Sequence, residues 1–310
     1  MMAGAAETST IYDSEEVAEG PGFRWCHLQR SASAERLLLE DREIPDDLAW
    51  ALLERDTLPR AIRSGDAVAV FLRGINEARG AEPEDMISLR LCVLPDRIIS
   101  LELRRLPVID GLISDFREGK APATIEAFVI HIVETLRAAV ERELDALEAD
   151  VHLLELHSAG RSGDLGKDER AKLADMRQDA IIIHRFVAPQ SSALEQLVTL
   201  APSWLEDTAT LREEAEGFRR IAADLESVRA RGAIVSEELR AAQADRQNRS
   251  FLLLTAISVV FLPLTFLTGL LGVNLDGIPF AGREWSFPAF GLLLVAVAAL
   301  SGWIAARMLR

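Results

Sequence analysis

The chain has 310 residues and a formal net charge of -15, which is long enough for a soluble domain together with a membrane portion. From residue 251 onward it carries three arginines against two acids, so the negative charge lies in the first 250 residues. A domain this acidic repels nucleic acid, and the absence of a basic stripe argues against nucleic acid as a partner.

Residues 1–20 lack the basic start and the apolar core of a signal peptide, and we expect them to form a mobile acidic tail. Residues 21–250 are expected to form a cytoplasmic domain, whose first part, about 21–120, has the pattern of a small sheet with helices. Alternating apolar runs predict strands at 22–28, 67–73, 86–94 and 97–103, and Pro45 opens a helix. The sequence contains no glycine-rich nucleotide loop.

The second part of this domain, residues 121–250, has the periodicity of long helices. We expect helices over 122–157, over 167–186 with a stop before Pro189, and over 192–200. After Pro202 no proline occurs until Pro263, so we predict a stalk helix that starts at Ser203 and runs unbroken into the membrane. A rod from there to residue 271 would measure about 100 Å and would be unstable alone, which predicts an oligomer.

Residues 251–310 are expected to form a transmembrane domain with two helices, at 251–271 and 287–308, joined by an extracytoplasmic loop. The first span would rise about 32 Å as a helix, close to the thickness of a bilayer's hydrocarbon core. Three arginines precede the first span and two end the second, whereas the loop has one. This distribution places both termini in the cytoplasm and predicts a multi-pass membrane protein.

One face of the first span carries small and hydroxylated residues at spacings of three and four. Such a stripe allows close helix packing, or it forms a pore wall in which hydroxyls replace part of an ion's water. Pro263 in the same span leaves a backbone carbonyl without its usual donor, which suits a pore-facing helix. The members of the stripe, extended backward along the same face, are Asn248, Phe251, Thr255, Ser258, Leu262, Thr265 and Gly269.

The cytoplasmic domain offers no convincing set of metal ligands. His131 with Glu134, and His152 with Glu155, share helix faces, but these helices are highly charged and solvated side chains are expected there. Cys26 and Cys92 are far apart in sequence and should remain reduced thiols. Since no nucleophile–base pair occurs either, the sequence predicts neither an enzyme nor a bound cofactor.

The triplet Gly272-Val273-Asn274 ends the first span and would be an ordinary helix end in another place. Here it follows a proline-containing span and precedes a second span at the C-terminus. The chain thereby resembles the CorA-type metal transporter superfamily, whose members end in two spans joined by a loop starting Gly-Met-Asn. PLTFLTGLLGVN follows the family pattern, and Val273 with the following LDGIP is similar to the ZntB zinc-transporter branch.

The resemblance implies a homopentamer in the bacterial inner membrane, with a cytoplasmic funnel and five first spans around an axial pore. Asn274 would hydrogen-bond the water shell of an incoming divalent ion at the outer mouth, and Gly272 and Val273 would shape that turn. The resemblance further implies transport of Zn²⁺ and other divalent transition metals, coupled to protons. It assigns the pore lining to Thr265 and Gly269 in the outer part, to the narrowing residues Leu262, Leu254 and Phe251, and to Asn248 near the inner end.

Two alternatives stay open at this point. A magnesium or cobalt channel of the CorA type has the same architecture, although Leu271 and Val273 stand where that branch usually has an aromatic residue and methionine. A membrane-anchored structural or interaction protein without transport activity would also have two spans and a stalk.

Overall fold

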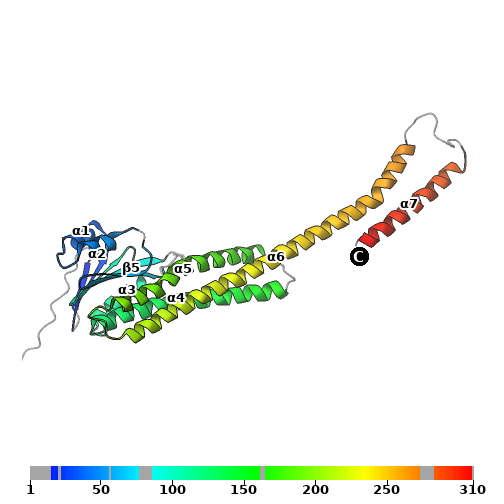
Figure 1. Ribbon diagram of the computed structural model, residues 1–310. Coiled ribbons are helices and arrows are strands. Elements are labelled where there is room, and N and C mark those ends of the chain that lie inside the picture. Colours follow the sequence, from blue (N-terminus) through cyan, green and yellow to red (C-terminus); the bar gives the residue numbers. More distant parts are fainter. Residues whose placement is uncertain are drawn as a thin grey trace, which may run out of the picture. The chain divides into compact units, whose positions relative to one another are not determined.

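A computed structural model of the chain describes residues 15–19, 22–55, 57–76, 86–160, 165–272 and 283–308. The chain divides into one compact unit of residues 1–159 and 165–236 and a second unit of residues 160–164 and 237–310. The expected fold class is confirmed: a small sheet with helices is followed by one very long helix and by a second helix of membrane-spanning length (Figure 1).

The sheet has six strands in the order β1-β2-β6-β5-β4-β3, and all neighbours are antiparallel except β2 and β6. The strands β4 and β5 are buried along their whole length, which explains their nearly continuous apolar sequences. The strands are β1 (Glu15–Glu19), β2 (Arg24–Gln29), β3 (Arg60–Ser64), β4 (Ala67–Gly74), β5 (Ile87–Val93) and β6 (Arg97–Glu102).

Four of these strands were predicted, and the two edge strands were not. The sequences of β1 and β3, EEVAE and RAIRS, are short and polar, so they lack the alternation that reveals a half-buried strand. The structure pairs residues 15–19 with β2, so this part of the expected N-terminal tail is a strand.

Helices cover both faces of the sheet (Figure 1). On one side lie α1 (Ala32–Glu40) and α2 (Asp46–Leu53), which share an apolar core with Leu28 of β2. On the other side α3 (Pro107–Arg117) and α4 (Ile125–Gly160) bring Phe116 and Phe128 against Trp25 of the same strand. Because side chains alternate along β2, this strand contributes residues to two separate cores, one on each face of the sheet.

Helix α5 (Lys167–Leu200) is continuous, so the predicted break before Pro189 is wrong. The helix packs on β3 and β4. The side-chain carbonyl of Gln190 accepts the Arg73 amide of β4 at 3.1 Å, and that of Gln196 accepts the Ala61 amide of β3 at 3.1 Å. These contacts offset the cost of about 3 kcal/mol that an internal proline imposes on a helix.

Helix α6 (Thr208–Leu271) starts five residues later than predicted, because Asp207 and not Ser203 caps it. The Asp207 carboxylate accepts the amides of Ala209 and Thr210, each at 3.1 Å. From α4, Glu126 accepts the Glu206 amide at 2.6 Å and the Asp207 amide as well. From its start to residue 236 this helix belongs to the first unit.

Ion pairs and one close approach hold α4 and α5 against the first part of α6. The Arg137 guanidinium of α4 donates to the buried Glu214 carboxylate at 2.7 Å. Toward the other end, Arg231 makes two hydrogen bonds to Glu155, at 2.8 and 2.6 Å, and holds the pKa of that carboxyl below its usual range. A Cβ at Gly217 would come within 2.6 Å of the Arg137 Cδ, so glycine at this position makes room for the Arg137–Glu214 pair.

We therefore expect Gly217→Ala to lower the thermal unfolding midpoint, although alanine favours a helix by about 1 kcal/mol over glycine. The added methyl group would displace Arg137 from Glu214. Gly111→Ala in α3 is the matched control: a Cβ there meets no atom within 4 Å, so the midpoint should rise. Differential scanning fluorimetry of both variants measures the two midpoints. A higher midpoint for Gly217→Ala than for the wild type would contradict the proposed role of the Gly217–Arg137 contact.

Candidate ion pathway

Two helices of the described chain are long and apolar enough to cross a membrane, by length and composition. They are α6, whose apolar part is its last 21 residues, and α7 (Ser286–Met308). The two helices end at residues 271 and 308, where the predicted spans end, and α7 begins one residue before the predicted 287. Residues 273–282, which join them in the sequence, lie outside the described residues.

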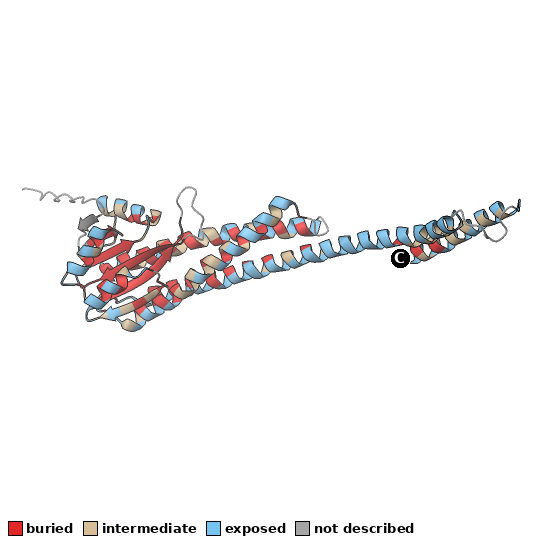
Figure 2. Ribbon diagram, turned by 90° about the horizontal axis from the view of Figure 1, so that it is seen from above, coloured by how far each residue is buried: buried red, intermediate tan, exposed pale blue. Residues whose placement is uncertain are grey.

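Helix α7 returns alongside the end of α6 in the second unit (Figures 1 and 2). Within the apolar parts of the two helices, Ala256 of α6 and Ser301 and Ala305 of α7 are the buried residues, each 7% exposed. On each helix, partly covered positions extend from these buried residues at spacings of three and four and form a covered stripe. These positions are 260, 263 and 267 in α6 and 290, 294 and 297 in α7. We infer that these stripes are the faces on which the two helices pack.

The predicted pore-lining stripe lies on a different face of α6. With about 100° per residue, its centre is roughly 150° around the helix from the covered stripe through Ala256. In Figure 2 the apolar part of α6 is largely pale blue, the colour of exposed residues. All eight assigned positions are exposed, namely Asn248, Phe251, Leu254, Thr255, Ser258, Leu262, Thr265 and Gly269, with Leu262 at 74% and Phe251 at 67%.

Two hydroxyl groups of this part of α6 bond back to their own helix. Ser258 donates to the Leu254 carbonyl at 2.9 Å, and Thr268, next to the stripe, donates to the Leu264 carbonyl at 2.9 Å. A hydroxyl whose proton is engaged in this way presents its oxygen lone pairs outward. Ser258 can therefore accept a hydrogen bond from the water shell of a cation without a formal charge in the span.

The end of α6 is shaped by Gly272. Its amide donates to the Thr268 carbonyl at 2.9 Å, which is the last bond of the helical ladder. A Cβ at this position would come within 2.9 Å of the same carbonyl oxygen, so no other residue fits without a shift of the backbone. Val273 and Asn274, the other two members of the predicted mouth, lie outside the described residues.

The described residues contain no group of three or more potential metal ligands. The on-face pairs His131–Glu134 and His152–Glu155 are 3.9 and 3.8 Å apart and partly exposed. Sequence reasoning missed a shorter contact, in which the His157 Nδ1 lies 2.7 Å from a Glu169 carboxylate oxygen. This contact joins α4 to α5, so the two residues are too far apart in the sequence for it to be predicted. Two ligands alone do not make a metal site.

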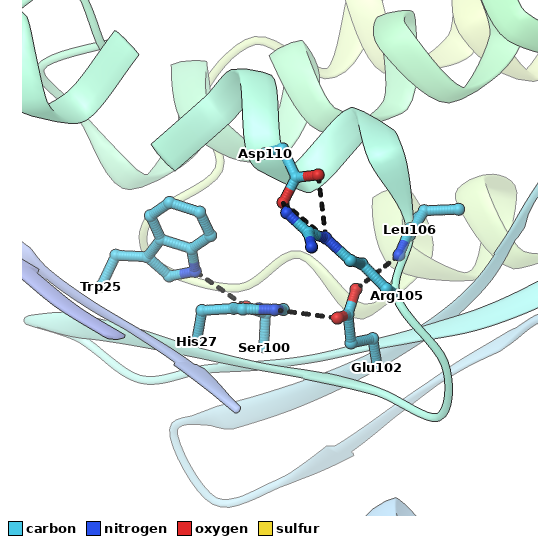
Figure 3. A network of polar contacts seen from close by, with 7 residues as sticks. All are labelled: Trp25, His27, Ser100, Glu102, Arg105, Leu106 and Asp110. Atoms are coloured by element: carbon cyan, nitrogen blue, oxygen red, sulfur yellow. Dashed lines mark hydrogen bonds and ion pairs between the residues drawn. The ribbon is translucent and has the colours of Figure 1, made fainter. Parts of the chain in front are cut away.

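One buried cluster has the composition of a hydrolase triad (Figure 3). The Ser100 hydroxyl lies 2.8 Å from the His27 Nδ1, and the His27 Nε2 lies 3.6 Å from Glu102. However, Ser100 is fully buried, and its oxygen accepts the Trp25 indole N–H at 2.9 Å. The second Glu102 oxygen accepts the Leu106 amide before α3 at 2.9 Å. Since no substrate reaches Ser100, these contacts join β2 and β6 to α3 and do not form an active site.

Comparison with known proteins agrees with this architecture. The family model "CorA-like Mg2+ transporter protein" matches residues 20–310. The chain is 34% identical to a divalent cation transporter, CmaX, of Pseudomonas aeruginosa, over 86% of this chain and 85% of that protein. It is 30% identical to a zinc transport protein, ZntB, of Pectobacterium carotovorum, over 90% of this chain and 85% of that protein.

A solved structure of full-length CmaX superposes with a TM-score of 0.81 at 28% identity, and the match covers 99% of each chain. The resemblance drawn from the residues 251–274 thus extends over nearly the whole chain. The chain belongs to the family of CorA-like Mg²⁺ transporter proteins, which makes it a divalent cation transporter of the CorA and ZntB type and not an enzyme.

Proposed function

We propose that this protein moves Zn²⁺ and other divalent transition-metal cations through an axial pore of a homopentamer. Five copies of α6 would line the pore with the stripe from Asn248 to Gly269, and five copies of α7 would surround them. Gly272, Val273 and Asn274 would form the outer mouth. The protein would lie in the bacterial inner membrane with both termini in the cytoplasm.

One observation carries this proposal. The stripe assigned to the pore is exposed in the single chain and lies nearly opposite the face that α7 covers. A hydroxyl-bearing face turned away from α7 is suited to contact with copies of itself or with water. Five such faces around a common axis would have both kinds of contact. The edges of each face would contact the neighbouring copies, and its centre would contact the water of the pore.

The choice of zinc rests on Val273 and on the similarity to a relative that is named a zinc transport protein. Magnesium is the main alternative, since the matching family model carries that ion in its description. A ring of neutral Asn274 amides selects charge and hydrated size, and it discriminates weakly among hydrated divalent ions. Both predicted spans lack aspartate and glutamate, so coupling to protons would need a relay outside them.

Flux in proteoliposomes tests the proposal and separates its alternatives. With the full-length protein we expect Zn²⁺ uptake well above that of protein-free liposomes, larger than Mg²⁺ uptake, and faster when a pH gradient is imposed. Larger Mg²⁺ or Co²⁺ flux would assign the protein to the magnesium and cobalt channels. Absence of flux for all three ions would favour a membrane-anchored interaction protein.

A further inference from the structure

The inner end of α7 carries two side chains that the proposed pore does not use, Trp303 and Arg307. They lie one helical turn apart, and Trp303 is 59% exposed although it is the largest side chain in that part of the helix. The Arg307 guanidinium carbon lies 5.5 Å from the centre of the Trp303 ring, within the range of a cation–π contact. In the described chain Arg307 has no ion pair with a carboxylate.

Both side chains face away from α6. With about 100° per residue, Trp303 and Arg307 lie roughly 120° to 160° around α7 from the stripe of Ser301 and Ala305 that packs on α6. This outward face is the one that meets lipid when α7 spans a membrane outside α6. Trp303 and Arg307 therefore stand where the hydrocarbon core of a bilayer gives way to the headgroups.

The charge at this end of the two helices is positive. Arg249 precedes the apolar part of α6, and Arg307 ends the apolar part of α7, which runs back alongside α6 and has a similar length. The two arginines therefore mark the same edge of the two spans. At the opposite end of α7, Arg283 is followed at once by Glu284, so the charges there balance. The basic side chains thus gather at one of the two membrane edges.

We propose that Trp303 and Arg307 form a binding site for the phosphate group of anionic phospholipids at the inner edge of the membrane. Stacking on the indole ring fixes the plane of the guanidinium, and its remaining N–H groups can donate in pairs to phosphate oxygens. Arg249 adds positive charge to the same layer, which favours lipids with a net negative headgroup over zwitterionic ones. The site rests on the membrane orientation of the proposed function and not on transport.

Lipid binding to the purified full-length protein, measured by native mass spectrometry with phosphatidylglycerol and phosphatidylcholine, tests the site. The wild type should bind phosphatidylglycerol several-fold more tightly than phosphatidylcholine. A cation beside an anionic headgroup contributes about fivefold to binding, so Arg307→Gln should lose about that factor for phosphatidylglycerol and little for phosphatidylcholine. Arg307→Lys should retain part of the preference, because it keeps the charge but not the planar fork.

Arg283→Gln removes the same charge at the other end of α7 and serves as the matched control. Equal affinity of the wild type for the two lipids would overturn the proposal, as would an equal loss for Arg283→Gln and Arg307→Gln. Metal flux is measured separately, so a protein that prefers phosphatidylglycerol but moves no metal would refute the proposed transport and leave the lipid site standing. The unfolding midpoint of each variant establishes that it is folded, and both arginines lie on exposed positions.

Discussion

Asn274→Ala is expected to reduce metal flux in proteoliposomes to the level of protein-free liposomes. In the proposed pentamer five Asn274 amides hold the water shell of the entering ion, because direct dehydration of a small divalent cation is expensive. Each such hydrogen bond contributes about 1 kcal/mol, so removal of the ring costs about 5 kcal/mol and lowers flux by a factor of about a thousand or more. Uptake of Zn²⁺ measured with an internal fluorescent indicator gives this ratio.

Asn76→Ala is the matched control, since it removes the same amide from the first unit just after β4. Its flux should stay within about a factor of two of the wild type. Gel filtration and the unfolding midpoint must be unchanged in both variants, so that a loss of flux is not a loss of folding. Undiminished Zn²⁺ flux in Asn274→Ala would remove Asn274 from the pathway.

Trp25→Ala is expected to have the largest effect on the stability of the first unit. Trp25 is 1% exposed, and its ring lies 4.9 Å from that of Phe128 and 5.1 Å from that of Phe116, between centroids. Truncation of a buried aromatic side chain costs about 3–5 kcal/mol, because apolar area is lost and a cavity remains. For a domain of this size the unfolding midpoint should fall by on the order of 10 °C.

Trp25→Phe separates packing from hydrogen bonding. It keeps an aromatic ring against Phe116 and Phe128 but removes the indole N–H that donates to Ser100. We expect it to cost about 1–2 kcal/mol, clearly less than alanine. If both variants lowered the midpoint equally, the hydrogen bond to Ser100 and not the aromatic core would control the stability of this region.

The C-terminal ends of the two long apolar helices could be predicted from the sequence. An uncharged run of bilayer length needs no tertiary information, and the predicted ends at residues 271 and 308 coincide with the ends of α6 and α7. The long helix could be predicted because no proline occurs between Pro202 and Pro263. Strands β4 and β5 could be predicted because strands buried along their whole length have nearly continuous apolar sequences.

What could not be predicted depends on partners distant in sequence. The continuity of α5 through Pro189 depends on packing against β3 and β4. The start of α6 depends on Glu126, whose carboxylate accepts a hydrogen bond from the Glu206 amide eighty residues later in the chain. The stripe of α6 was visible, but the face that α7 covers, through Ala256, has no sequence signal of its own. The assignment of the stripe to a pore remains a prediction that rests on exposure and family membership.

Cysteine accessibility along α6 tests that assignment most directly. Single cysteines at Ser258 and Thr265, on the stripe, are compared with cysteines at Ala256 and Leu267, on the covered face. The background carries Cys26→Ser, while Cys92 can stay, because burial raises the pKa of its thiol to about 12 and keeps it unreactive.

A charged methanethiosulfonate reagent, added to proteoliposomes, reacts only with thiols that contact water. If the stripe lines a water-filled pathway, Ser258→Cys and Thr265→Cys should be modified at least about ten times faster than the other two, and modification should block metal flux. Equal and slow modification at all four positions, with flux unaffected by the reagent, would contradict the pore assignment.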